Sequence, residues 1–166
     1  MLLTSEFFVR GRGKMPHSAA PQTDHKPTVL VVDDDPTVVT LCQKILQQAG
    51  CSVLSASGSS EALKICKGHT GQIDVLVTDL VLPPPEFSFA SSGNEFPHVH
   101  GHELALRALR MRADLRVILM SGNVEHELAA YGIRTGTLPL LAKPALVRQK
   151  LEKMMQQLKQ EARPSP

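Results

Sequence analysis

Aromatic residues are scarce in this sequence, which has no tryptophan, one tyrosine and five phenylalanines among its 166 residues. The sequence also lacks an apolar run of about 18 residues, the length that a helix needs to cross a membrane, so we expect no membrane span. Its net charge is only +2, which is too close to neutral to predict direct binding to nucleic acid. With 42% hydrophobic residues, a chain of this length should form one domain and a tail.

Cysteine is also rare. Cys42, Cys51 and Cys66 are odd in number and lie inside periodic segments. This favours buried free thiols in a reducing compartment over a disulfide framework. The opening residues MLLTSEFFVRGRGK make a poor signal peptide, because polar residues interrupt the apolar stretch and the positive charges follow it. We therefore expect a cytoplasmic protein.

The hydrophobic pattern divides the chain into three parts. Residues 1–27 are rich in Arg, Gly, Pro, Ser and His without a sustained period, and we interpret them as a flexible N-terminal extension. Ordered structure is expected over residues 28–161, and residues 162–166 form a short C-terminal tail.

Within 28–161 the pattern alternates between strands and helices. Strands are predicted at 28–32, 51–56, 73–78, 115–120 and 138–142. Helices are predicted from Pro36 to Gly50 and at 58–69, 102–111, 123–131 and 145–161. The first strand, TVLVV, is a continuous β-branched run that suits burial on both faces. Right-handed crossovers turn this order into an α/β fold with a doubly wound, five-stranded parallel sheet.

Polar side chains stand where four of these strands end. Asp33 and Asp34 follow the first strand, Asp79 the third, Ser121 the fourth and Lys143 the fifth. Because ligands of such sheets bind outside the carboxyl ends of the strands, we expect these residues to meet on one rim. Three crowded carboxylates repel one another unless a cation lies among them, and their hard oxygen atoms suit Mg²⁺.

Together these residue types describe a carboxylate that can accept a phosphoryl group. Asp79 is the expected nucleophile, Mg²⁺ neutralises charge, Lys143 supplies a positive point charge, and Ser121 donates a hydrogen bond. Taken singly, each has an ordinary alternative as a helix cap, a turn or a helix start. We assign the capping role to Asp35, which precedes Pro36, and this leaves the two aspartates before it for the site.

The motifs VLVVDDDP, VTDLVLP, VILMSGN and LLAKP resemble those of the response-regulator receiver domain of two-component signalling. The resemblance covers about residues 28–161 and implies a flavodoxin-like fold with strand order 2-1-3-4-5. It implies that Asp34 and Asp79 ligate Mg²⁺ directly, together with the backbone carbonyl of Val81, and that Asp33 acts largely through water. The phosphoryl donor would be a phosphohistidine on a sensor histidine kinase or a phosphotransfer protein.

The same resemblance limits the enzymatic activity that we expect of this chain. We expect no enzyme, apart from self-phosphorylation from phosphohistidine and slow autodephosphorylation. No DNA-binding or catalytic output region follows the domain in this sequence. Signalling is therefore expected through contact with an output protein, through a phosphate relay, or as part of a larger protein, and homodimerisation is left open.

Three departures from the family pattern stand out. Ala145 replaces a Phe that is common in the family after the Lys-Pro pair. Leu140 holds a position where receivers usually carry Tyr or Phe, which puts the usual output switch in doubt. The glycine that follows the phosphoacceptor in the family corresponds here to Gly101, twenty-two residues after Asp79. An insertion at about 84–100 is therefore expected after the third strand. Its three phenylalanines favour an ordered loop beside the pocket over a disordered insertion or a metal site at His98 and its neighbouring histidines.

Two other functions fit parts of the sequence. Asp33, Asp35 and Thr37 match the Asp-x-Asp-x-Thr motif of haloacid-dehalogenase-type phosphatases, which also need a later acidic pair on a strand. The only acids after the lysine, Glu152 and Glu161, fall in a predicted helix, which argues against this alternative. The other alternative is a pseudo-receiver that binds partners without being phosphorylated, and the intact acidic residues argue against it.

Overall fold

The structure is a computed structural model of the whole chain. It describes residues 26–84, 98–122, 140–143, 149, 151–153 and 156. The predicted helix at 123–131, the tail and almost all of the N-terminal extension lie outside the described residues. So do residues 85–97 of the expected insertion. Of the predicted helix at 145–161, the described residues are all helical.

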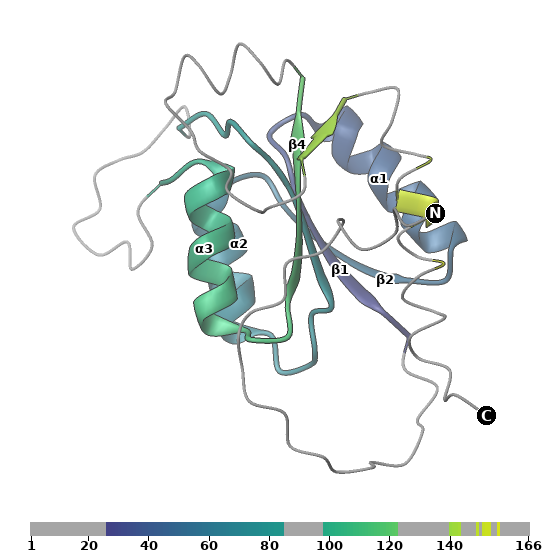
Figure 1. Cartoon of the computed structure of the whole chain (residues 1–166), viewed down its shortest axis with the longest axis horizontal. Helices are drawn as coiled ribbons and strands as arrows, with labels where there is room; N and C mark the ends of the chain where they lie inside the picture. The colour runs from purple at the N-terminus through teal and green to yellow at the C-terminus, as the bar shows by residue number, and fades with distance from the viewer. Residues whose placement is uncertain are drawn as a thin grey trace, which may run out of the picture.

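A parallel sheet forms the centre of the molecule (Figure 1). Its strands are β1 (Thr28–Val32), β2 (Ser52–Ala56), β3 (Val75–Asp79), β4 (Arg116–Ser121) and β5 (Leu140–Ala142). They lie in the order β2-β1-β3-β4-β5, and every neighbouring pair is parallel. The expected α/β, flavodoxin-like arrangement is therefore confirmed, with β3 in the middle of the sheet.

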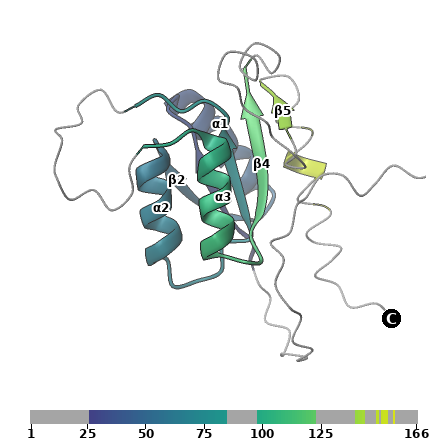
Figure 2. The ribbon, with the colours of Figure 1, turned by 60° about the vertical axis from the view of Figure 1, so that its left-hand side comes forward.

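Helices cover both faces of this sheet. The described helices are α1 (Pro36–Gln48), α2 (Ser59–Gly68) and α3 (Gly101–Met111). Figures 1 and 2 show α1 on one face, and α2 beside α3 on the other. The doubly wound arrangement thus holds for the part of the chain that the structure describes.

Helix α1 begins as the sequence predicts. The side chain of Asp35 accepts a hydrogen bond from the backbone N–H of Thr37 at 2.8 Å, and Pro36 occupies the first turn. After the helix, Gly50 adopts a φ of 86°, a left-handed conformation that favours glycine. The cap fixes where the chain turns away from β1, and so it fixes which aspartates remain at the strand end.

Alternate residues of the strands pack into two separate apolar clusters, one on each face of the sheet. Leu30 and Val32 point to the side of α2 and α3, whereas Val29 and Val31 point to the side of α1. Leu151, from the predicted last helix, joins the α1 side. Because successive strand side chains face opposite ways, a strand segment buried on both faces must carry apolar residues at every position, as residues 29–32 of β1 do.

The three cysteines are buried and free, as expected from their placement. Burial raises the pKa of the Cys42 thiol to about 11, so this group stays protonated and acts as a small apolar side chain. None of the described helices is long and apolar enough to span a membrane.

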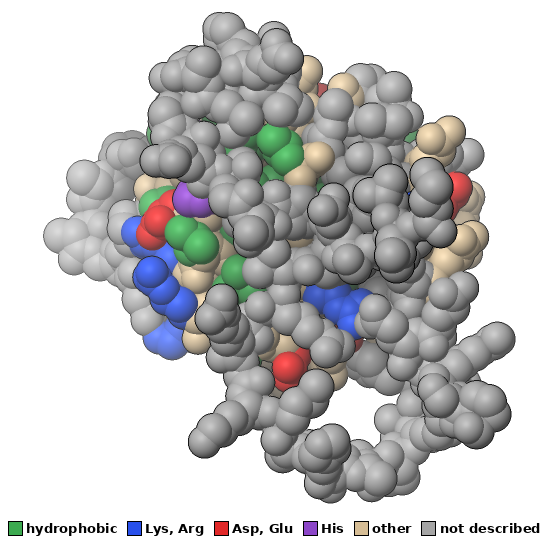
Figure 3. All heavy atoms as spheres, viewed as in Figure 1, with side chains coloured by type: hydrophobic (Ala, Val, Ile, Leu, Met, Phe, Trp, Pro, Cys, Tyr) green, Lys and Arg blue, Asp and Glu red, His purple; other side chains and the backbone are tan. Residues whose placement is uncertain are grey.

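Charged side chains of both signs lie over α3 on the face shown in Figure 3. One pair is Arg107 and Glu103, which approach to 2.9 Å one turn apart on the helix. Both are partly exposed, so the pair contributes little to stability.

Candidate functional site

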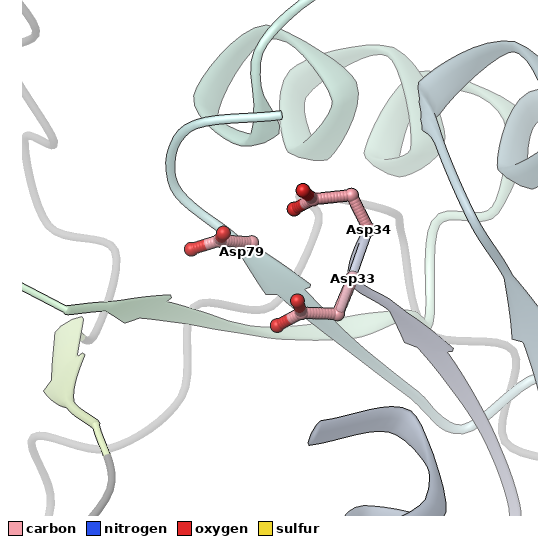
Figure 4. A group of neighbouring side chains, drawn as sticks. All are labelled: Asp33, Asp34 and Asp79. Atoms are coloured by element: carbon pink, nitrogen blue, oxygen red, sulfur yellow. The ribbon is translucent and has the colours of Figure 1, made fainter. Parts of the chain in front are cut away.

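Three aspartates meet at the carboxyl end of the sheet. Asp33 and Asp34 directly follow β1, and Asp79 is the last residue of β3, the strand beside it. One carboxylate oxygen from each of the three lies within 4.8 Å of the others. Figure 4 shows all three carboxylates pointing toward the same side of the sheet end. Asp33 is buried, Asp79 is 9% exposed and Asp34 is exposed, so the cluster opens from the interior to solvent.

Lys143 reaches this cluster from the edge of the sheet. Its Nζ lies 2.5 Å from Oδ2 of Asp33 and 3.1 Å from Oδ2 of Asp79. Burial alone would lower the pKa of Lys143, but the hydrogen bond to Asp33 and the charge of Asp79 outweigh it, so the pKa is raised. The side chain is therefore an ammonium group at neutral pH, placed between two carboxylates.

The Asp33 carboxylate is held from two sides. Its Oδ1 accepts a hydrogen bond from the backbone N–H of Asp35 at 3.0 Å, while Oδ2 faces the ammonium group of Lys143. Since the turn into α1 supplies that N–H, the helix cap also orients the acid next to it.

Ser121 and Leu140 lie on the β4 and β5 side of the site. Ser121 is the buried last residue of β4, and its carbonyl accepts the backbone N–H of Lys143 at 2.7 Å. Leu140 is partly buried and packs against the apolar cluster on the side of α2 and α3. The position expected for an aromatic is thus occupied by an aliphatic side chain within the core.

The donor set fits a divalent cation. Among the described residues, the three carboxylates of this cluster lie beside one ammonium group, which contacts Asp33 and Asp79, so the four groups together carry a net negative charge. Hard oxygen donors with this charge suit Mg²⁺, which binds through one or two carboxylates and keeps several waters. The half-buried Val81 lies two residues after Asp79, within reach of the same end of the sheet.

Gly101 brings the start of α3 against the backbone of Asp79. Its N–H donates to the carbonyl of Leu80 at 3.0 Å. A Cβ placed on this residue would lie 1.8 Å from the Asp79 carbonyl oxygen, far inside any allowed contact. Glycine is therefore required here by the close approach of two backbones, although twenty-two residues separate the two positions in the sequence.

The sequence did not predict the contacts that Ser59 and His98 make between α2 and the segment before α3. Ser59, at the start of α2, is buried, and its Oγ accepts the backbone N–H of Val99 at 2.9 Å. The same oxygen lies 3.4 Å from Nδ1 of His98. The imidazole rings of His98 and His100 contact each other edge to face, with their centroids 5.6 Å apart. Among the described residues the acidic cluster is the one group with a metal-binding arrangement, so the histidine metal site gains no support.

Comparison with protein families and curated proteins gives a consistent result. Residues 29–86 match the model of the response regulator receiver domain. The chain is 28% identical over 121 residues to the two-component response regulator ORR24 of Oryza sativa subsp. indica, covering 73% of this chain and 17% of that protein. It is 46% identical over 55 residues to the alkaline phosphatase synthesis transcriptional regulatory protein PhoP of Bacillus subtilis, covering 33% of this chain and 22% of that protein. The chain thus spans only a small part of these relatives.

Solved structures share the fold. A CheY-like response regulator receiver domain protein from Methanospirillum hungatei superposes with a TM-score of 0.60 at 22% identity, covering 82% of this chain and 96% of that one. A response regulator protein from Burkholderia pseudomallei with a phosphorylated aspartic acid gives 0.56 at 23% identity, covering 84% and 76%. TrrA from Thermotoga maritima in complex with Mg(2+)-BeF gives 0.55 at 22%, covering 80% and 98%. These structures show that the chain has the fold of receiver domains, and the match over residues 29–86 supports a response-regulator receiver domain in this part of the chain.

Proposed function

We propose that this domain accepts a phosphoryl group from a phosphohistidine onto Asp79, in a Mg²⁺-dependent reaction, and signals through contact with another protein. The observation that carries the proposal is the position of Asp79. It ends the central strand, lies within the acidic cluster, and has the Lys143 ammonium 3.1 Å from its carboxylate. A carboxylate held beside a fixed cation in this way is suited to attack phosphorus and to carry the added charge.

Each residue of the site has a distinct part in this reaction. Asp79 supplies the attacking oxygen, Lys143 offsets negative charge on the transferred group, and the Ser121 hydroxyl donates a hydrogen bond to it. Asp34 and Asp79 would hold Mg²⁺ with the Val81 carbonyl. When bound, the cation neutralises charge on the phosphoryl oxygens.

Asp33 has a different part in the proposal. Because its two oxygens already face the Asp35 N–H and the Lys143 ammonium, we assign it to the metal through water. Its buried charge also holds the lysine in place. The exposed Asp34 is better placed than Asp33 to bind an arriving cation directly.

The proposed partners follow from this chemistry. The donor is a sensor histidine kinase or a phosphotransfer protein, because phosphohistidine is the form in which such proteins present the phosphoryl group. The output is an unidentified protein that distinguishes the phosphorylated domain, and slow autodephosphorylation resets it. We propose no turnover of small phosphate esters, and a homodimer is one form that the signalling state could take.

The test is phosphorylation of the purified chain by acetyl phosphate and Mg²⁺, followed by mass spectrometry. We expect one added phosphoryl group on the wild-type protein, located at residue 79. Asp79→Asn should abolish it, whereas Asp114→Asn, which changes an exposed aspartate after α3, should not. Full labelling of the Asp79 variant, or turnover of a phosphomonoester at catalytic rates, would contradict the proposal.

Identification of the kinase needs a second experiment. The chain is incubated with each phosphorylated sensor kinase and phosphotransfer protein of the source organism, and loss of label from the donor is followed at short times. Rapid transfer to wild-type protein but not to Asp79→Asn identifies the physiological donor.

A further inference from the structure

A buried hydroxyl group lies directly before the proposed phosphoacceptor. Thr78 is the residue of β3 that precedes Asp79, and it is 0% exposed. Its neighbour two positions earlier, Leu76, belongs to the apolar cluster on the side of α2 and α3. Because strand side chains alternate between the two faces, the Thr78 hydroxyl lies on this apolar side, where a hydroxyl without a hydrogen bond would be costly.

The Thr78 hydroxyl is paired with the backbone of Asp79 itself. Its Oγ1 donates a hydrogen bond to the carbonyl oxygen of Asp79 at 3.1 Å. The same peptide unit is held at its other end, because the N–H of Leu80 donates to the carbonyl of Met120 on β4 at 2.6 Å. A peptide unit is planar, so a hydrogen bond at each end fixes the orientation of the whole unit.

The start of α3 restricts this peptide unit from a third direction. A Cβ at Gly101 would lie 1.8 Å from the Asp79 carbonyl oxygen, so this oxygen is already packed against the backbone of Gly101. The Gly101 N–H donates to the next carbonyl, that of Leu80, at 3.0 Å. The Thr78 hydroxyl and the Gly101 N–H therefore hold two successive carbonyls, beginning with that of the residue that would be phosphorylated.

We propose that Thr78 is a positioning residue for phosphoryl transfer, whose hydroxyl holds the peptide between Asp79 and Leu80 and thereby the direction in which the Asp79 carboxylate leaves the end of β3. That carboxylate points toward the same side of the sheet end as the other two aspartates of the acidic cluster (Figure 4). The inference rests on the proposed function, since it concerns the same carboxylate, but it assigns a role to a side chain outside the acidic cluster.

The physical reason is the alignment that phosphoryl transfer requires. An oxygen of the Asp79 carboxylate forms a bond to phosphorus while the bond from phosphorus to the leaving oxygen of the donor breaks, with the two oxygens roughly in line. The aspartate side chain is short, so the backbone from which it extends largely decides where its oxygens lie. A displacement of about 1 Å in a reacting group can cost about a hundredfold in rate, so the loss of one supporting hydrogen bond should be measurable.

The test compares Thr78→Val with Thr78→Ser in the full chain. Valine keeps the shape of threonine without the hydroxyl, whereas serine keeps the hydroxyl without the methyl group. Each protein is mixed with Mg²⁺ and acetyl phosphate, from which acetate leaves, and the rate of phosphorylation at Asp79 is followed by mass spectrometry. We expect Thr78→Val to react about tenfold more slowly than the wild type, and Thr78→Ser to react at close to the wild-type rate.

The matched control is Thr40→Val. The Thr40 hydroxyl also donates to a backbone carbonyl, that of Pro36 at 2.7 Å, but this hydrogen bond is exposed on α1. The control variant should be phosphorylated at the wild-type rate. All rates are measured well below the melting temperature of each variant, so a slower reaction is not a loss of folded protein.

The outcomes separate this inference from the proposed function. If the wild-type chain gains no phosphoryl group at Asp79, both fail. If the wild type is phosphorylated and Thr78→Val reacts equally fast, only the role of Thr78 fails. The same conclusion follows if Thr78→Ser is as slow as Thr78→Val, because the side chain would then act through its packing and not through its hydrogen bond.

Discussion

At the scale of single residues, the pair formed by Asp33 and Lys143 decides the electrostatics of the site. Their side chains are only 1% and 14% exposed. A buried ion pair adds little compared with an apolar pair of the same size, but removal of one partner leaves a buried charge and costs about 3 kcal/mol or more. The lysine thus contributes to the stability of the fold as well as to the proposed chemistry.

This pair has a pH dependence of definite sign. The pKa of Lys143 is raised above its ordinary value of 10.5 in the folded protein. Its stabilising contribution is therefore complete below that pH and is lost as the pH rises through the higher folded value. We predict that wild-type protein exceeds Lys143→Met in free energy of unfolding by a constant amount from neutral pH upward, and that the excess falls only above pH 10.5.

Urea denaturation without Mg²⁺ at a series of pH values measures this difference. Lys44→Met, which changes an exposed lysine of α1, should match the wild type within about 0.5 kcal/mol at every pH. A difference for Lys143→Met that already declines near pH 8 would show that the ion pair is not what stabilises the fold.

Sequence reasoning could place some site residues and not others for one physical reason. Asp79 and Lys143 directly end or follow apolar runs, and parallel strands bring such positions together whatever lies between. Ser59 and His98 are thirty-nine residues apart and meet through the packing of a helix against a loop. In the sequence Ser59 is an ordinary helix-start serine, so nothing distinguishes it from many others.

At the scale of elements, Arg112 joins the end of α3 to the end of α2. Its guanidinium donates to the carbonyls of Cys66 at 2.8 Å, His69 at 2.5 Å and Gly71 at 2.8 Å. These carbonyls belong to the last turn of α2 and the loop that follows, where a helix leaves its acceptors unsatisfied. One side chain therefore closes the end of one helix from the end of another.

We predict that Arg112→Lys lowers the free energy of unfolding by about 2 kcal/mol, because an ammonium group cannot reach three acceptors arranged for a planar fork. Arg110→Lys, at an exposed position two residues earlier, should have almost no effect. Equilibrium denaturation of the two variants compares them directly. Equal stability of both would mean that solvent replaces the three hydrogen bonds without cost.

Gly101 gives a second prediction at this scale. Gly101→Ala places a methyl group 1.8 Å from the Asp79 carbonyl oxygen, so α3 or the end of β3 must shift. We expect a loss of about 2 kcal/mol in stability, together with weaker Mg²⁺ binding. Gly68→Ala is the matched control, because a Cβ there meets no atom within 4 Å and alanine favours the helix.

Thermal unfolding and calorimetric Mg²⁺ titration test both parts of the prediction. If Gly101→Ala is as stable as Gly68→Ala, the backbone near Asp79 can shift to admit the methyl group without a loss of stability, and the prediction is wrong.

Element positions were predictable to within a few residues, and the exceptions have local causes. The cap at Asp35 and the glycine at residue 50 fixed both ends of α1. Helix α3 begins at Gly101, one residue before the prediction, at the point where the Gly101 N–H donates to the carbonyl of Leu80. The described part of β5 begins at Leu140, and residues 138 and 139 of the predicted strand lie outside the described residues.

At the scale of the whole molecule, the parallel sheet gathers the ends of β1, β3, β4 and β5 on one side. The topology was predictable because strands buried on both faces alternate with amphipathic helices, and few arrangements bury such strands. The path of the chain between β3 and α3 was not predictable, because the length and composition of this segment match no regular pattern.

Mg²⁺ should stabilise the entire domain if it binds at this end of the sheet. A ligand that binds only the folded state, present at about 100 times its Kd, adds about 2.7 kcal/mol. We predict that this increment disappears with a chelator, and also in Asp34→Ala, whose exposed side chain can be removed with little effect on the metal-free fold. Melting curves with and without Mg²⁺ measure it.

An Asp34→Ala protein that gains as much from Mg²⁺ as the wild type would place the cation elsewhere. Asp114→Ala, which removes an exposed carboxylate outside the cluster, is the control and should keep the full increment.

The ion pair between Asp33 and Lys143 also has a consequence during synthesis of the protein on the ribosome. The two residues are 110 positions apart. At the usual pace of translation, about 5 to 20 residues per second, the ribosome adds the lysine roughly 5 to 20 s after the aspartate. During that interval the nascent chain carries the acidic residues without their cationic partner. The acidic end of the sheet therefore gains this cationic partner only after the last strand has been made.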